Sequence, residues 1–241
     1  MTHREAAASA PAQTQSTPRR SSFGGDVLRL VSGSFIAQIL GFLAAPILTR
    51  LYAPEAFGLL ALFTSITSIL GVIACLRYEM AIVLPESERN GANVFGLSLA
   101  VNALVALTLV PLLWFGGDAL VVWLNAPALK PYLWLIPVVV MFGGLGAGHP
   151  ALNYWATRTR RYQLKATVHV TGVATTDGLQ LAAGFAGFVS GGSLILTSII
   201  GSMIGPLILG WRILREDGRL FLASISLPGM VEALKRYRKF P

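Results

Sequence analysis

The sequence contains little charge for its length. Only 12% of its 241 residues are Asp, Glu, Lys or Arg, whereas 54% are hydrophobic. A soluble globular domain carries about 25% charged residues, so this composition indicates a membrane protein. The formal charge of +8 would favour a nucleic-acid partner only if the basic residues were gathered on one surface, and their distribution, described below, excludes that partner.

Residues that build catalytic and metal sites are also scarce. The single cysteine, Cys75, lies in an apolar run and has no second cysteine with which to form a disulfide in this chain. The three histidines share no metal-binding spacing with one another or with acids. The acidic residues are scattered apart from Glu79, Glu86 and Glu88, and no nucleophile-elbow, Walker or zincin motif occurs. We therefore expect no enzyme activity, no cofactor and no metal.

Six stretches are long and apolar enough to cross about 30 Å of hydrocarbon as helices rising roughly 1.5 Å per residue. None alternates in polarity as a membrane β-strand does. The sequence therefore predicts an all-α transmembrane fold, a six-helix bundle over residues 23–215. The expected spans are Val27–Thr49, Phe57–Leu76, Asn93–Phe115, Pro131–His149, Ala166–Val189 and Gly191–Ile213.

The segments outside the bundle are polar. Residues 1–22 are mostly Ala, Ser, Thr, Gln and Pro, too little apolar surface to offset the entropy of folding, so we expect a disordered cytoplasmic tail. Residues 216–241 form a basic cytoplasmic segment. Within it, Met230, Val231, Leu234 and Tyr237 share one helical face, which predicts either an amphipathic helix at the membrane interface or a solvated tail.

Lys and Arg are distributed unequally between the connections of the spans. Seventeen of the 19 basic residues lie on the side that holds the N-terminus, and only Arg50 and Lys130 lie on the opposite side. Basic residues accumulate in cytoplasmic loops, so we expect a multi-pass protein with both termini in the cytoplasm. The positive charge then reflects topology, and we expect no nucleic-acid partner.

Few polar groups lie inside the spans. Asp177 is about eleven residues into the fifth span, where a charge costs about 2.5–3.5 kcal/mol on insertion scales. Such a carboxyl either faces a cavity, with a possible role in proton coupling, or is a neutral packing residue, and Gln180 lies close to its face. Asn102 and Gln38 are further cavity candidates, with helix packing as the alternative for each.

Proline and glycine in the spans indicate bendable, closely packed helices. Pro46, Pro111, Pro137 and Pro206 each remove a helical hydrogen bond and favour a kink. Gly201 and Gly205, spaced four residues apart, allow another helix to approach closely. These features are typical of a transporter, although ordinary packing in a bundle would also use them.

Two segments resemble a known family. The segment Arg50-Leu-Tyr-Ala-Pro-Glu-Ala-Phe-Gly58 resembles the turn after the first span of bacterial polysaccharide (O-antigen type) flippases. The segment Leu76-Arg-Tyr-Glu-Met-Ala-Ile-Val-Leu-Pro85 resembles that family's segment after the second span. The resemblance extends from Arg29 to Pro241. It implies a bacterial inner-membrane member of the multidrug/oligosaccharidyl-lipid/polysaccharide exporter superfamily, which moves a lipid-linked oligosaccharide between leaflets during polysaccharide or lipopolysaccharide biosynthesis.

That resemblance also sets expectations for partners. Family members have twelve or more spans in two six-helix lobes, and this chain resembles the N-terminal lobe. We therefore expect a fragment, a truncated product, or a lobe that pairs with a second polypeptide or another copy. The expected ligands are a lipid-linked oligosaccharide and membrane lipids, with Arg29 and Arg77 as the candidate contacts of the headgroup. A related drug or lipid-precursor exporter, and a non-transporting subunit that scaffolds envelope polysaccharide enzymes, remain alternatives.

Overall fold

The structure, a computed structural model, describes residues 23–145 and 148–238, so the tail expected over residues 1–22 lies outside it. The described residues form helices and no strand, which confirms the all-α transmembrane fold. The elements in chain order are α1 (Phe23–Leu51), α2 (Pro54–Ala74), the 3-10 helix η1 (Tyr78–Val83), α3 (Glu88–Trp123), the 3-10 helix η2 (Pro127–Tyr132), α4 (Leu135–Met141), α5 (Pro150–Arg158), α6 (Tyr162–Phe185), α7 (Gly191–Ser224) and α8 (Leu227–Arg236).

Five of the six expected spans are continuous helices. Four of them, α1, α2, α3 and α7, are both long and apolar enough to cross a membrane. The fifth expected span is α6, whose 24 residues would extend about 36 Å, but whose middle carries Thr, Gln and Asp side chains. Helices α3 and α7 continue past their expected ends, to Trp123 and Ser224. The prolines inside α1, α3 and α7 do not end these helices.

The fourth expected span, Pro131–His149, is not one helix, so the prediction was wrong at this place. Helix α4 ends at Met141 and α5 begins at Pro150. Between them Gly143, Gly144 and Gly148 have φ of 93°, 86° and 71°, a region that glycine enters without a steric penalty. Glycine is also a poor helix former, so this glycine-rich stretch breaks the helix that its apolar neighbours would otherwise continue.

Asn102 of α3 holds the two sides of this break. Its Nδ2 donates to the carbonyl of Met141 at 2.9 Å and lies 3.1 Å from Nε2 of His149. Because the amide nitrogen is the donor to Met141, Nε2 of His149 accepts, and the neutral ring carries its proton on Nδ1. Irregular backbone at membrane depth is tolerated where protein buries it or a cavity adjoins it, and Asn102 supplies part of that burial.

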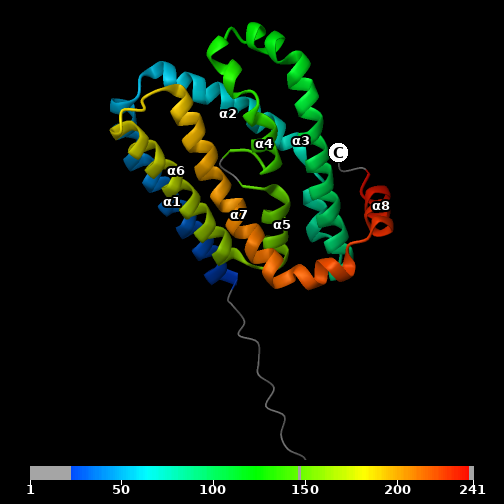
Figure 1. Ribbon diagram of the computed structural model, residues 1–241. Helices are drawn as coiled ribbons and strands as arrows, with labels where there is room; N and C mark the ends of the chain where they lie inside the picture. The colour runs from blue at the N-terminus through cyan, green and yellow to red at the C-terminus, as the bar shows by residue number, and fades with distance from the viewer. Residues whose placement is uncertain (1–22, 146–147, 239–241) are drawn as a thin grey trace, which may run out of the picture.

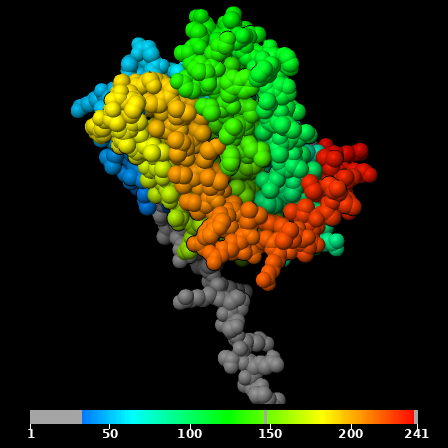
Figure 2. Space-filling view, viewed as in Figure 1, coloured from blue at the N-terminus to red at the C-terminus, as the bar shows by residue number. Residues whose placement is uncertain are grey.

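Helix α6 packs between α1 and α7, as Figures 1 and 2 show for α6 and α7 on one face of the molecule. Glycines permit the close approach on both sides. A Cβ added at Gly33 of α1 would collide with Ala166, and one added at Gly201 of α7 would collide with the backbone of Thr176. The expectation that Gly201 and Gly205 allow a close helix contact is thereby confirmed, and the partner is α6.

The first family-like segment forms the turn between α1 and α2. Pro54 occupies the first turn of α2, where its missing N–H costs nothing. Tyr52 is buried, its ring packs edge-on against Phe57, and its hydroxyl donates to the carbonyl of Gln180 at 2.8 Å. This turn therefore fastens the C-terminal part of α6 to α1 and α2.

The second family-like segment forms η1 at the opposite end of the bundle. Tyr78, Ala81 and Ile82 are buried in the core cluster there. Arg158 of α5 donates from Nη1 to the carbonyl of Ile82 at 2.9 Å. The same cluster contains Trp155, whose indole N–H donates to Asp217 of α7 at 2.7 Å. The segment thus closes the end of the bundle that carries the basic connections.

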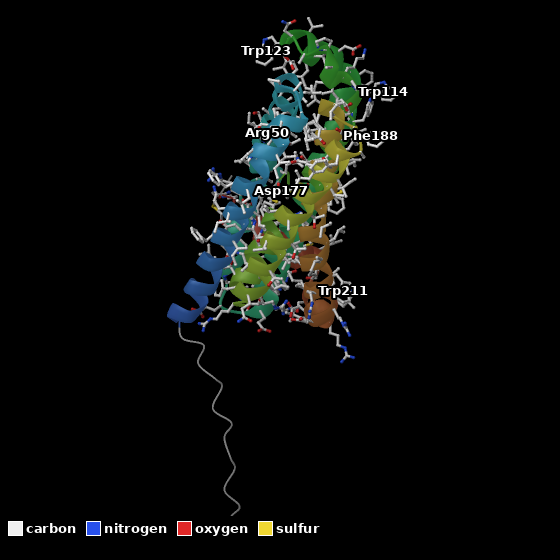
Figure 3. The ribbon with its side chains drawn as sticks, turned by 90° about the vertical axis from the view of Figure 1, so that its left-hand side faces the viewer. Arg50, Trp114, Trp123, Asp177, Phe188 and Trp211 are labelled. Atoms are coloured by element: carbon white, nitrogen blue, oxygen red, sulfur yellow. The ribbon has the colours of Figure 1, made fainter. Side chains whose placement is uncertain are left out.

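Exposed aromatic side chains lie towards the two ends of the bundle. Trp114, Trp123 and Phe188 lie towards one end with Arg50, Trp211 lies towards the other, and Asp177 lies between them (Figure 3). Trp is enriched where a protein meets both membrane–water interfaces. The separation of these rings along α3 and α7 is therefore consistent with a bundle that crosses the bilayer along its long axis.

The two ends can be assigned to the two sides of the membrane by cysteine labelling. In a Cys75→Ala background, we expect Ala128→Cys to react with an impermeant maleimide in intact bacterial cells from which the outer membrane has been made permeable. Glu86→Cys should react only once the inner membrane is also opened, since it lies on the side with the basic connections. Both positions are exposed, so the reverse pattern would invert the topology.

The break after α4 depends on the amide of Asn102, which is buried. Asn102→Ala should lower the free energy of unfolding by about 1–3 kcal/mol, because the Met141 carbonyl and the His149 ring lose their partner. Ser98→Ala is the matched control, since this buried hydroxyl bonds only the Val94 carbonyl of its own helix. Thermal unfolding in detergent measures both, and an equal effect of the two variants would contradict the assignment.

Candidate functional site

A pocket of about 530 Å³ lies inside the bundle, against one face of α6. Its walls come from α1, α2, α5, α6, α7 and the residues around the break before α5. The polar residues that line it are Ser34, Thr64, His149, Asn153, Lys165, His169, Thr176, Asp177, Ser198 and Ser202. Its apolar lining includes Leu60, Leu145, Val168, Val173, Pro206 and Leu209.

Helix α6 supplies the ionisable side chains of this pocket at helical spacing. Lys165, His169, Val173 and Asp177 follow one another at intervals of four residues and all line the pocket. Residues four apart lie close to one face of a helix, so three ionisable side chains, with Val173 between them, follow one another over about 18 Å at 1.5 Å per residue. Lys165 lies in the first turn of α6, and Asp177 lies near the middle of the bundle (Figure 3).

Asp177 lies near the middle of α6 and lines the pocket. It is partly buried, and its Oδ2 is buried without a hydrogen-bond partner among the described residues. Gly41 of α1 faces it, since a Cβ there would lie 3.9 Å from Oδ2. An unbonded carboxyl oxygen at this depth is costly, so the carboxyl is available to a proton, a hydroxyl or a cation that enters the pocket.

Gln180 lies behind the pocket and is not one of the lining residues. It is buried, and its Nε2 donates to Oγ of Ser198 at 2.9 Å, which joins α6 to α7. Its backbone carbonyl accepts the Tyr52 hydroxyl. Gln180 therefore holds the helix that carries Asp177, while Ser198 is the group of this pair that lines the pocket.

Asn102 also supports the pocket from behind. It is buried on α3, and His149, which it contacts, forms part of the pocket wall. Beside the break, Pro206 of α7 has no N–H for the carbonyl of Ser202, four residues before it, and a Cβ added at Gly148 would lie 3.8 Å from the Pro206 ring. The helix break and the proline thus place irregular or under-bonded backbone beside the cavity, where a polar ligand can reach it.

Two further candidates lie away from the pocket. Gln38 and Arg77 are exposed and do not line it. The side chain of Arg29 lies outside the described part of the structure, which gives only its place near the start of α1. The structure therefore brings together Asp177 with the supports Gln180 and Asn102, and it does not bring Gln38 or Arg77 to them.

Lys165 is the site residue that the sequence reasoning missed. It is partly buried, and its Nζ donates to Oγ1 of Thr157 at 2.8 Å. No ion pair between described residues neutralises it, whereas its neighbour Arg161 pairs with Asp217 at 2.8 Å and Glu216 at 3.3 Å. The spacing of Lys165 from His169 and Asp177 is visible in the sequence, but the basic loop Arg158–Lys165 was interpreted only through its bearing on topology and its fit to the flippase family.

The arrangement suits non-covalent binding. The pocket offers a cation and donors near one end, a carboxyl near the middle, and hydroxyls along α7. Within residues 23–145 and 148–238, no group of three or more His, Cys, Asp or Glu side chains is placed to hold a metal ion. What the geometry supports is recognition of a ligand that carries both hydroxyl and anionic groups.

The chain was compared with known proteins. Residues 47–220 match the model of a family described as polysaccharide biosynthesis protein. No curated protein and no solved structure matches the chain. The matched region contains both family-like segments and almost every residue of the pocket. The chain belongs to the polysaccharide biosynthesis protein family.

Proposed function

We propose that this protein is a carrier that flips a lipid-linked oligosaccharide across the bacterial inner membrane, and that it is not an enzyme. The observation that carries the proposal is the polar pocket along α6. It lies within a bundle of membrane-spanning helices, where polar side chains are expensive and usually functional. Membership of a polysaccharide biosynthesis family supports a sugar-bearing ligand.

The chemistry of the pocket matches such a ligand. A lipid-linked sugar presents hydroxyls and phosphate oxygens, which need donors and a cation to leave water. Lys165 has no carboxylate partner among the described residues and is therefore placed to meet a phosphate. Ser198, Ser202, Thr176 and Asp177 can exchange hydrogen bonds with sugar hydroxyls. We therefore assign the contact with the lipid headgroup to Lys165 in place of Arg77.

The pocket reaches the surface of the lobe. Ser34 and His169 line it and are themselves exposed. A polar ligand in this pocket would meet lipid at that opening unless protein covered it. We therefore include in the proposal a second lobe, either another copy of this chain or a separate polypeptide, that closes the cavity during transport.

Flipping can be measured in proteoliposomes that contain a polyprenyl diphosphate with a fluorescent disaccharide, bleached in the outer leaflet by an impermeant reductant. Lys165→Gln should lower the initial rate roughly tenfold or more, because a hydrogen bond to a charged group contributes about 1.5–3 kcal/mol. Asp177→Asn in the same assay tests whether the carboxyl must ionise. Arg160→Gln is the matched control, since it removes an exposed charge outside the pocket. Equal rates for Lys165→Gln and the control would remove Lys165 from the site.

The need for a second lobe can be tested by dilution. At a protein-to-lipid ratio that leaves one copy per vesicle, we expect the purified chain to give no flipping above the level of empty vesicles. If the partner is another copy, the rate should rise with the square of the copy number at low occupancy. Full activity at one copy per vesicle would show that one lobe suffices.

A further inference from the structure

Helix α8 has two apolar faces, of which the bundle covers one. It spans Leu227–Arg236, and the hydroxyl of Ser226 caps it by accepting the N–H of Gly229 at 3.2 Å. At 3.6 residues per turn, Met230 and Ala233 point one way and Leu227, Val231 and Leu234 point another. An amphipathic helix that only packed on the bundle would need the first of these faces alone.

The inner face is fixed to the start of α3. Ala233 is buried, and Met230 and Tyr237 pack against the core cluster that contains Phe95 and Trp155. Gly229 lies so close to Asn93 of α3 that an added Cβ would fall 2.5 Å from its Oδ1. The orientation of α8 about its own axis is therefore determined by α3.

Asn93 also fixes the junction between α7 and α8. Its Nδ2 donates to the carbonyls of Arg89 at 2.9 Å and Ser224 at 3.0 Å, and its Oδ1 accepts the N–H of Ser226 at 3.0 Å. A single buried side chain therefore makes all three hydrogen bonds. The turn between the two helices thus has a set geometry, and α8 is held at the edge of the molecule (Figures 1 and 2).

The outer face of α8 is apolar and bordered by cations. Leu227, Val231 and Leu234 are 78%, 47% and 40% exposed. Lys235 in the last turn and Arg238 directly after the helix are exposed, and no ion pair between described residues holds either of them. Arg236 lies on the other side of α8, where it lines a groove with Asn93 of α3, and Glu232 is the single acid of the helix. The pattern of an apolar stripe beside a positive border is that of a helix at a membrane interface.

We propose that the outer face of α8 is a docking surface for anionic phospholipids of the leaflet at the basic end of the bundle. Leu227, Val231 and Leu234 enter the boundary between headgroups and acyl chains, and Lys235 and Arg238 contact lipid phosphates. The positive charge beside the outer face favours an anionic leaflet as the partner of α8. A second copy of the face would bring its own cations against these, whereas an anionic leaflet attracts them. The proposal is independent of what the pocket carries.

The test uses the full chain in nanodiscs that hold one copy each, made of phosphatidylcholine alone or with phosphatidylglycerol. Amide hydrogen exchange over residues 225–238 is measured on the unaltered protein. A bimane fluorophore at Val231→Cys in the Cys75→Ala background gives a second readout. With phosphatidylglycerol, we expect slower exchange in α8 and a blue shift of the fluorophore, both reversed by high salt.

Variants that each remove one cation beside the outer face of α8 measure how much that cation contributes to docking. Each basic residue near an anionic surface contributes about 1 kcal/mol, which is roughly fivefold in an equilibrium constant. Lys235→Gln and Arg238→Gln should therefore each reduce the docked-to-undocked ratio about fivefold. The control pair Arg77→Gln and Arg160→Gln removes two exposed charges that are not on α8 and should leave the ratio unchanged. Equal protection without phosphatidylglycerol, or protection that appears only with two copies per disc, would overturn the proposal.

Discussion

Helix α6 is packed between α1 and α7, and the rest of the bundle depends on this contact. Its polar face carries a lysine, a histidine and an aspartate within about 18 Å, and lipid would not accept that face. Gly33 and Gly201 let the two neighbouring backbones come close, at Ala166 and Thr176. The polar groups then meet a cavity between helices instead of hydrocarbon, and the pocket follows from that shielding.

The rest of the bundle secures this arrangement. Near the turn between α1 and α2, the Tyr52 hydroxyl donates to the carbonyl of Gln180, whose side chain donates to Ser198. Next to the pocket, the break between α4 and α5 replaces a helix by irregular backbone, which the cavity and Asn102 together make tolerable. The two segments that resemble the flippase family lie at the ends of the bundle and contribute no side chain to the pocket. Their part in the structure is to hold the helices that do.

The functional proposal therefore rests on a different set of residues from the family-like segments. Membership of a polysaccharide biosynthesis family is established by the match over residues 47–220. The pocket provides the side chains that we propose contact a sugar-bearing ligand. A cation without a carboxylate partner in the described structure and a carboxyl with an unbonded oxygen line one cavity. Both would be a cost to stability without a ligand, which is the usual mark of a binding site inside a membrane.

Hydropathy and the distribution of Lys and Arg determined much from the sequence by itself, because lipid rejects unpaired backbone and charge. They predicted an all-α membrane fold, four expected spans that are long and apolar enough to cross a membrane, and Asp177 as the residue to examine. Only the tertiary structure decided the rest. Gly143, Gly144 and Gly148 favour non-helical backbone, and they break the fourth expected span although its other residues are apolar. A hydropathy average does not register this backbone preference.

Gln38, Asn102 and Gln180 are all polar residues within expected spans. Gln38 is exposed whereas the other two are buried supports, because packing sets the rotation of each helix about its axis. Lys165 belongs to the pocket because of the helices that pack around α6. The sequence of α6 alone does not specify which helices those are.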